Sequence, residues 1–313
     1  YKPKNCKITF NGYLRNDNKA ATRNEIWIIP TVGCVNNTAK RLEKIGQEII
    51  GERCDGVFAY THPFGCSQLG DDRENTRKIL ASLANHPNAG GVLIVSLGCE
   101  NTNVKTFKKY LGNYNESRIK FLVTQDCEDE LEDGKKLIKE LYDYVKDFKR
   151  EPIPLNKLVI GYKCGGSDAF SGICANALCG RLTDRVTSFG TSAILTEVPE
   201  MFGAETLLMQ RCKNRETFDK CVDMINSFKQ YFFSHNQECY ENPSPGNHDG
   251  GITTLEEKSL GCIQKGGKAI ITDILKYGEH CKKPGLSLLT GPGNDIVSVT
   301  NLTAAGANII LFT

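Results

Sequence analysis

The sequence lacks long hydrophobic runs. No apolar stretch reaches the roughly 18 residues that a membrane span needs, and the apolar segment 91–97 has the length of a buried strand. The charges nearly cancel, with 39 Lys and Arg against 37 Asp and Glu and a formal net charge of +2. This balance gives no sign of a nucleic acid or a membrane as partner. The first residues lack the pattern of a secretory signal, so we expect a cytoplasmic protein.

The 14 cysteines lack the spacing of disulfide frameworks and zinc motifs. No pair has the C-x-x-C spacing, so neither a zinc ribbon nor a small disulfide-stapled domain is predicted. Without a sign of export, the thiols are expected to be reduced. Most should pack as small buried side chains. We expect this most of Cys54, Cys174, Cys179, Cys212 and Cys221.

Three sequence motifs of common enzyme classes are also missing. The chain has no GxSxG elbow and no GxGxxG that opens the first helix, which argues against an α/β-hydrolase and a dinucleotide enzyme. It has no GxxxxGK[ST] loop, which argues against a P-loop nucleotide enzyme. Internal repeats and low-complexity tracts are absent as well.

Strand-like and helix-like segments alternate along the chain. Predicted strands lie at residues 24–30, 54–60, 91–97, 119–124, 157–162, 191–196, 269–272, 286–289 and 308–312. Predicted helices lie at 37–50, 71–85, 128–148, 172–186, 203–212, 215–234 and 255–261, with one more between 101 and 119. Residues 241–251 are expected to form a long irregular loop, and 291–295 a glycine-rich loop after a strand.

The alternation predicts an α/β fold with mainly parallel sheets and right-handed crossovers. The length of 313 residues suggests about two domains. We expect two Rossmann-like units, 1–150 and 151–313, packed around a shared cleft and joined by a proline-containing linker at 149–154. The start of the chain, and its end directly after a strand, predict that it is part of a longer protein.

Cysteine recurs where predicted strands of the first unit end. Cys34, Cys66 and Cys99 each follow a glycine directly after such a strand. The carboxyl ends of parallel strands share one edge of the sheet, where ligands bind. Because thiolate and imidazole suit iron or zinc better than magnesium, these cysteines, His62 and Cys164 are candidate ligands of an open divalent-metal site. Cysteine packing and a loop role for His62 are the alternatives.

A Cys-Gly-Gly-Ser-Asp segment lies between a predicted strand and a predicted helix. Paired glycines let backbone N–H groups approach a ligand closely, and a helix start favours anions. A tight turn with Ser171 as helix N-cap is the alternative. The candidate substrate-binding residues are Gly165, Gly166, Ser167 and Asp168 of this segment and Asn247 of the irregular loop.

Two glutamates and a lysine are candidate catalytic residues. Glu197 and Glu200 follow a predicted strand and are a candidate acid/base pair. A charge at a helix start explains Glu200 equally well. Lys258 could bind a substrate carboxylate or act as a base, while a solvated surface charge is the simpler interpretation.

Nearly the whole chain resembles the altronate/galactarate dehydratase family. The segments that carry the resemblance are 23–36, 64–72, 86–88, 97–101, 164–168, 195–205, 241–247, 250–256 and 258–262. The resemblance implies a cytoplasmic hydro-lyase that converts D-altronate to 2-dehydro-3-deoxy-D-gluconate in hexuronate breakdown. Galactarate or a sulfonated hydroxy acid is the alternative substrate, and a sugar-acid-binding module without catalysis is the alternative function.

The resemblance also implies a cofactor and further chain. The expected cofactor is Fe²⁺, with Mn²⁺ as another activator, and the number of thiols leaves an iron–sulfur cluster open. A small N-terminal domain before residue 1 and a stretch after residue 313 are expected from the family. The expected partners are a small sugar acid and a second copy of the chain in a dimer, with no nucleic acid and no membrane.

Overall fold

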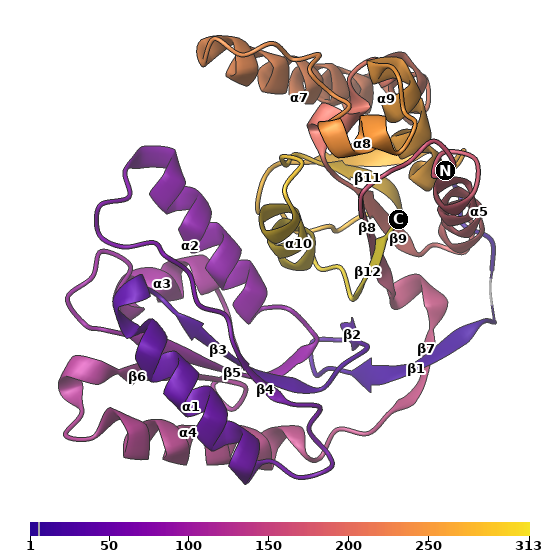
Figure 1. Ribbon diagram of the computed structural model, residues 1–313. Coiled ribbons are helices and arrows are strands. Elements are labelled where there is room, and N and C mark those ends of the chain that lie inside the picture. The colour runs from indigo at the N-terminus through magenta and orange to yellow at the C-terminus, as the bar shows by residue number, and fades with distance from the viewer. Residues whose placement is uncertain (6) are drawn as a thin grey trace. The chain divides into compact units, whose positions relative to one another are not determined.

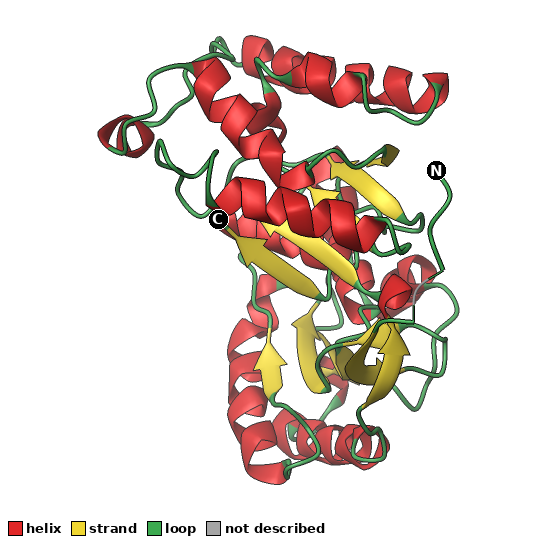
Figure 2. Cartoon of the chain, turned by 90° about the vertical axis from the view of Figure 1, so that its right-hand side faces the viewer, coloured by secondary structure: helices red, strands yellow, loops and turns green. Residues whose placement is uncertain are grey.

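The computed structural model describes residues 1–5 and 7–313. The chain divides into two compact units. The N-terminal unit is Phe10–Ile153, and the C-terminal unit contains Pro154–Thr313 together with Tyr1–Thr9. In each unit, helices flank a sheet (Figures 1 and 2), so both are α/β as predicted.

The main sheet of the N-terminal unit has four parallel strands in the order β4-β3-β5-β6. These strands are β3 (Glu25–Pro30), β4 (Val57–Ala59), β5 (Ala89–Ser96) and β6 (Ile119–Val123). Every residue of β3 and β5 is buried. Continuous burial is expected of central parallel strands whose two faces are both covered by helices.

Helices cover this sheet on both sides. They are α1 (Asn36–Ile49), α2 (Gly70–Ala84), α3 (Val104–Leu111) and α4 (Glu130–Val145). Helices α1 and α4 lie on one face, and α2 and α3 on the other (Figure 1). Two short 3₁₀ helices, η1 (Gly33–Val35) and η2 (Thr124–Asp126), follow the ends of β3 and β6.

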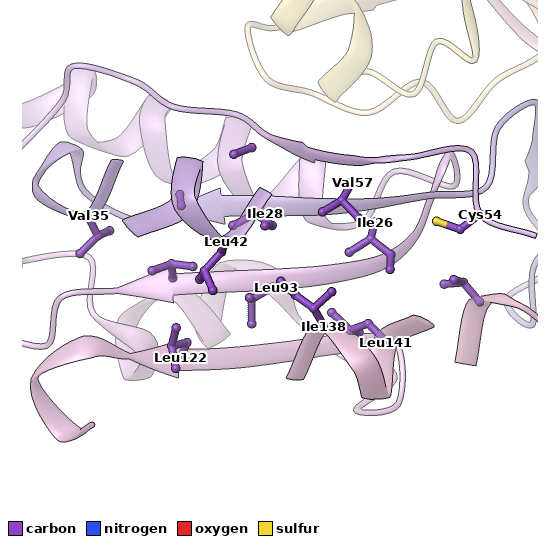
Figure 3. Close-up of a cluster of buried hydrophobic side chains, with 14 of the residues drawn as sticks. Ile26, Ile28, Val35, Leu42, Cys54, Val57, Leu93, Leu122, Ile138 and Leu141 are labelled. Carbon is purple, nitrogen blue, oxygen red and sulfur yellow. The ribbon is translucent and has the colours of Figure 1, made fainter. Parts of the chain in front are cut away.

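The core under α1 and α4 is purely aliphatic at its centre. Ile26 and Leu93 from the strands meet Leu42 from α1 and Ile138 and Leu141 from α4 (Figure 3), and all five are fully buried. Full burial of each such side chain stabilises the fold by roughly 1.5–3 kcal/mol. This packing fixes the strands, and with them the loops at their carboxyl ends.

A second, three-stranded sheet has the order β2-β1-β7. Its strands are β1 (Thr9–Leu14), β2 (Ala20–Ala21) and β7 (Glu151–Pro154), and β1 and β2 are antiparallel. The boundary between the two units lies within the predicted linker 149–154, but residues 151–154 of that segment form strand β7. Pro152 and Pro154 lack an N–H group, but β7 is an edge strand, where proline is tolerated.

The sheet of the C-terminal unit has five parallel strands in the order β10-β11-β9-β8-β12. The strands are β8 (Val159–Lys163), β9 (Ser192–Leu195), β10 (Ile271–Leu275), β11 (Gly285–Leu289) and β12 (Ile309–Phe312). From β8 the chain continues to β9 on one side, and β12 later joins β8 on the other. Ligands of open α/β sheets bind at such a switch point, beyond the carboxyl ends of the strands.

Six α-helices and three 3₁₀ helices are seen in the described part of this unit. The α-helices are α5 (Ala175–Thr187), α6 (Glu205–Met209), α7 (Arg215–Ser234), α8 (Pro245–Asp249), α9 (Leu255–Ile263) and α10 (Asp295–Ala304). The 3₁₀ helices are η3 (Leu155–Lys157), η4 (Val198–Met201) and η5 (Gln264–Gly266). Within residues 1–5 and 7–313, no helix combines the length and apolar character that crossing a bilayer requires.

Two of these helices differ from the predictions. Helix α8 lies within the segment expected to be an irregular loop, and α10 follows the predicted loop at 291–295. Helix α10 is rich in β-branched residues, whose helix propensity is low. It is nevertheless capped, because the Asn294 side chain accepts a hydrogen bond from the Val297 N–H.

Candidate active site

Loops at the carboxyl ends of β8 and β9 meet helix α9 in one buried group of ionisable side chains. Lys163 is the last residue of β8 and Cys164 follows it, Glu197 and Glu200 follow β9, and Lys258 lies on α9. The exposed fraction of Lys258 is only 2%, so its interpretation as a solvated charge is wrong. We call this group the strand-end cluster; its members are Lys163, Cys164, Glu197, Glu200, Lys258, Cys262 and Lys265.

Lys163 and Glu197 form the ion pair that joins β8 to the loop after β9. Lys163 Nζ lies 2.7 Å from Glu197 Oε1 and 2.7 Å from Asp295 Oδ1. Glu197 Oε2 accepts a hydrogen bond of 2.7 Å from the Cys164 N–H. Burial acts to lower the pKa of Lys163, but the hydrogen bonds to Asp295 and Glu197 outweigh it and hold the pKa above its ordinary value. Because both carboxylate oxygens of Glu197 are engaged, this residue positions Cys164.

The backbone of Glu197 has a left-handed conformation, with φ of 69°. Residues other than glycine rarely occupy this region, and such strain costs on the order of 1–3 kcal/mol. The two side-chain bonds of Glu197, and a hydrogen bond from the Val198 N–H to the Gly291 oxygen, hold the turn in place. Strain of this kind is common at functional sites, where the surroundings determine the conformation.

Cys164 has a cation and a second thiol beside it. Lys258 Nζ lies 3.3 Å from Cys164 Sγ. Cys262 follows Lys258 by one helical turn, so both face the same side of α9. The Cys262 thiol donates a hydrogen bond to Cys164, and this bond, with the nearby Lys265, Ser167 and Lys258, lowers the pKa of Cys164 against the effect of burial. The same hydrogen bond and burial raise the pKa of Cys262, so Cys164 is the more acidic thiol of the pair.

Glu200 is the member of the cluster best suited to proton transfer. Its Oε1 lies 3.2 Å from Lys258 Nζ, and its Oε2 lies 4.0 Å from Lys265 Nζ. Burial and the neighbouring charges of Glu197 and Cys164 raise its pKa to about 7, although both lysines oppose the shift. A carboxyl group with a pKa near the working pH can both accept and donate a proton.

The glycine-rich segment after β8 is a turn beside the cluster. The Gly165 N–H, a predicted donor to substrate, donates instead to the Thr313 oxygen at 2.7 Å. Gly166 has φ of 107°, which side chains rarely allow. Ser167 is buried, with Oγ 3.3 Å from Cys164 Sγ, and its carbonyl accepts a hydrogen bond of 2.8 Å from Asn247 Nδ2. Ser167 therefore lies beside the cluster, and Asn247 supports it.

Asp168 and Ser171 stabilise the next turn rather than the start of the helix. The Asp168 carboxylate is exposed and accepts hydrogen bonds from the Phe170 and Ser171 N–H groups. Helix α5 begins only at Ala175, with Cys174 as its N-cap residue and no side-chain cap. The predictions of Ser171 as N-cap and of Cys174 as a buried side chain are therefore wrong, since Cys174 is exposed at the helix end.

The other predicted buried cysteines lie inside the protein. Cys54, Cys179 and Cys221 are buried, as expected, while Cys212 is half-buried. Cys212 and Cys221 are also hydrogen-bonded to each other. The C-terminal unit thus has a second pair of neighbouring thiols.

Four of the predicted metal ligands lie in the N-terminal unit. Cys34, Cys66 and Cys99 are exposed; Cys34 lies in η1, and the other two lie in loops that follow β4 and β5. His62 Nδ1 accepts a hydrogen bond of 3.3 Å from the Phe64 N–H, and Nε2 lies 3.0 Å from the Pro30 oxygen. Both ring nitrogens therefore have backbone partners, and burial lowers the pKa of the ring.

These residues do not form a metal site within either unit. Over residues 1–5 and 7–313, no three His, Cys, Asp or Glu side chains gather as a group that could hold one metal ion. Cys164, the fifth candidate, belongs to the C-terminal unit, where its sulfur contacts Lys258 and Ser167. The metal-ligand set and the iron cofactor therefore stay predictions.

Sequence reasoning missed four residues of this region: Lys163, Cys262, Lys265 and Asp295. Two of them carried a usable signal. Lys163 directly precedes Cys164, and Cys262 lies four residues after Lys258, one residue beyond the predicted helix 255–261, so a slightly longer helix places both on the same face. Lys265 and Asp295 reach the site through the packing of η5 and α10, which the sequence pattern did not predict.

Comparison with known proteins adds a family to this geometry. Residues 12–146 match the second domain of D-galactarate dehydratase/altronate hydrolase, and residues 155–313 match the C-terminal domain of D-galactarate/altronate dehydratase. These two matches coincide closely with the two compact units, Phe10–Ile153 and Pro154–Thr313.

Individual relatives are named after the same two enzymes as the family. Altronate dehydratase of Bacillus subtilis is 55% identical over 310 residues, which cover 97% of this chain and 62% of the relative. Altronate dehydratase of Escherichia coli is 50% identical over 302 residues, which cover 96% of this chain and 61% of the relative. Galactarate dehydratase (L-threo-forming) of Escherichia coli is 29% identical over 319 residues, with coverages of 97% and 61%. The chain spans about three fifths of the length of these relatives, and it belongs to the D-galactarate dehydratase/altronate hydrolase family.

Proposed function

We propose that this protein is a hydro-lyase that removes water from D-altronate and forms 2-dehydro-3-deoxy-D-gluconate. Identities of 55% and 50% to two altronate dehydratases, against 29% to a galactarate dehydratase, support this choice of substrate. The observation that carries the chemistry is the contact of Glu200 with Lys258 in the strand-end cluster, at 3.2 Å. This contact supports a proton-transfer role for Glu200, because a buried cation lies beside its carboxyl group.

The reaction begins with the proton at C2 of the sugar acid. This proton is weakly acidic, because the neighbouring carboxylate is already an anion. Its removal builds a second negative charge on the carboxylate, and fixed donors and cations must stabilise that charge as it develops. Lys258 and Lys265, which are 2% and 1% exposed, supply buried positive charge next to Glu200.

Glu200 is the proposed acid/base group. As a carboxylate it takes the C2 proton, and as a carboxylic acid it then gives that proton to the departing C3 hydroxyl, which leaves as water. The enol that remains takes a proton from solvent at C3 and becomes the 2-keto acid. A pKa raised to about 7 suits both roles of Glu200 near neutral pH.

The other members of the cluster hold this arrangement in place. Glu197 binds the Cys164 N–H and Lys163, and the Cys164 sulfur lies 3.3 Å from the Lys258 ammonium. Iron, a homodimer and a cytoplasmic location belong to the proposal through the sequence resemblance. None of the steps above is assigned to a metal.

An assay of the natural full-length protein tests this function. Purified protein is incubated with D-altronate, galactarate or sulfolactate, with Fe²⁺ present, and the 2-keto product is followed by NMR. We expect the highest kcat/KM with D-altronate. Preferred turnover of either other acid would change the proposed substrate, and binding of D-altronate without turnover would favour the non-catalytic module.

A further inference from the structure

Three lysines are buried in the described part of the chain, and all three belong to the strand-end cluster. Lys163, Lys258 and Lys265 are 3%, 2% and 1% exposed. Lys163 Nζ has three oxygen acceptors at distances of 2.7 to 2.9 Å, one for each proton of an ammonium group. Lys258 Nζ has a sulfur at 3.3 Å and a carboxylate oxygen at 3.2 Å. The protein itself therefore supplies the partners of these two cations.

Lys265 differs, because its ammonium has no hydrogen-bond acceptor among residues 1–5 and 7–313. Its ion-pair partner, Oε2 of Glu200, lies 4.0 Å away, which is beyond the length of a hydrogen bond. A buried ammonium without hydrogen bonds is costly, and such groups are rare in native proteins. A role in binding or catalysis is one of the few reasons for a fold to keep one.

The backbone that carries Lys265 is held from two helices or turns of the same unit. The Thr183 hydroxyl donates a hydrogen bond of 2.7 Å to the Lys265 carbonyl, and Arg211 Nη2 donates one of 2.8 Å to the next carbonyl. Gly180 of α5 lies so close that an added Cβ atom would be 2.2 Å from the Gln264 oxygen. The position from which the Lys265 side chain extends is therefore fixed before a ligand arrives, which lowers the cost of binding.

We propose that the Lys265 ammonium binds the carboxylate of the substrate and makes the site selective for sugar acids over neutral sugars and polyols. An ammonium group offers charge and three donors but no acceptor, so it suits an anionic carboxylate. C2 is bonded to the carboxylate carbon, so a carboxylate held at Lys265 brings C2 beside Glu200. Sequence reasoning suggested Lys258 for this role, but the acceptors of Lys258 are already protein groups.

This inference rests on the proposed function for the reaction that follows binding, but carboxylate binding is measured separately. Glycerate repeats C1 to C3 of an aldonate, and glycerol carries a hydroxymethyl group in place of the carboxylate. The full-length protein is titrated with each compound in a calorimeter. We expect the parent protein to bind glycerate in preference to glycerol.

Lys265→Met should weaken glycerate binding by about 10- to 100-fold, the loss typical of a hydrogen bond to a charged group. Lys265→Arg keeps the positive charge and should retain part of the affinity. The matched control is Lys268→Met, three residues away and exposed, which should bind glycerate as the parent does. With D-altronate as substrate, KM should rise in Lys265→Met by a factor similar to the loss of glycerate affinity.

Unfolding in urea separates this role from a structural one. The Lys265 ammonium has no hydrogen bond to lose, and methionine removes the cost of burying its charge, so the unfolding midpoint of Lys265→Met should stay or rise. Lys258→Met should instead lower the midpoint, because Lys258 has two partners. Equal destabilisation by the two substitutions would overturn the proposal.

The binding experiment has its own contrary results. Equal affinity of the parent protein for glycerate and glycerol, or undiminished glycerate affinity in Lys265→Met, would overturn the proposal. Selective glycerate binding that Lys265→Met loses, in a protein that does not dehydrate D-altronate, would refute the proposed function and leave the carboxylate site standing.

Discussion

The ammonium of Lys258 on α9 lies 3.3 Å from the sulfur of Cys164 at the end of β8. The same ammonium lies 3.2 Å from Glu200, which follows β9. One buried lysine thus connects three elements that the chain builds far apart in sequence. Its charge is balanced by the acidic Cys164 sulfur and the Glu200 carboxyl group, since an unpaired buried cation would be costly.

Lys258→Met tests whether this cation supports the site. The loss of one partner from a buried ion pair typically costs about 3–5 kcal/mol, because the other charge stays buried. We expect a clear loss of stability in urea, together with slower alkylation of Cys164 by iodoacetamide at neutral pH, since the thiolate loses its cation. The exposed Lys268 is the matched control, and Lys268→Met should change neither property. Unchanged Cys164 reactivity in Lys258→Met would contradict the role of the ammonium.

Glu197→Gln tests the ion pair between the two strand ends. Glu197 and Lys163 side chains are both 3% exposed, so the neutral amide should destabilise the fold by about 3–5 kcal/mol. Denaturant unfolding measures this loss of stability. The control is Glu216→Gln, which breaks the exposed pair with Lys220 on α7 and should hardly move the unfolding midpoint. Equal effects of the two substitutions would show that the buried pair adds little.

The raised pKa of Glu200 predicts how stability depends on pH. Its pKa is 4.5 for the free group and about 7 in the folded protein, so the folded state holds the proton more tightly. This contribution is fully present below pH 4.5 and is lost as the pH rises through about 7. Glu200→Gln should flatten the fall in unfolding free energy between these pH values. If the unfolding free energy of the parent protein and of the variant fell equally steeply with pH, the raised pKa of Glu200 would be contradicted.

Gly180→Ala tests the packing that places Lys265. A Cβ atom at Gly180 of α5 would lie 2.2 Å from the Gln264 oxygen of η5 and 3.0 Å from the Gly267 Cα atom. The usual helix gain from alanine should therefore be reversed, with a loss of about 1–3 kcal/mol from overpacking. Gly246→Ala in α8 is the control, because no atom lies within 4 Å of the added carbon. Thermal unfolding distinguishes them, and a stabilised Gly180→Ala protein would count against this close approach.

Most of the fold was predictable because it follows hydrophobic patterning. The buried strands β3 and β5 are continuous apolar runs, and α7 begins and ends at the predicted residues, Arg215 and Ser234. Strand β7 was missed because its prolines are unfavourable in a strand, and helix α10 because its β-branched residues have low helix propensity. In both segments, tertiary contacts determine the secondary structure.

The candidate site was predictable in part. Glu197, Glu200 and Lys258 were named from the sequence, and the structure places them together around Cys164. The burial of Lys258 could not be predicted, because a lysine between two glutamates and a serine in sequence has the pattern of a surface helix. Its burial depends on how α9 packs against η4, which is a tertiary property.

Metal analysis tests the part of the proposal that comes from resemblance alone. Anaerobically purified full-length protein should contain iron without a matching amount of acid-labile sulfide. Sulfide equal to iron would indicate an iron–sulfur cluster. Cys66→Ser should lower the iron content if Cys66 is a ligand, whereas a variant with full iron content would remove Cys66 from the predicted set.

The central claim is that Glu200 transfers the proton in the dehydration of D-altronate. The most direct test is the pH dependence of kcat/KM for the full-length protein with this substrate. We predict that kcat/KM rises as the pH passes through about 7, the pKa of Glu200, and that Glu200→Gln loses activity without losing the fold. A Glu200→Gln protein that keeps the parent kcat/KM and its pH profile would contradict the account.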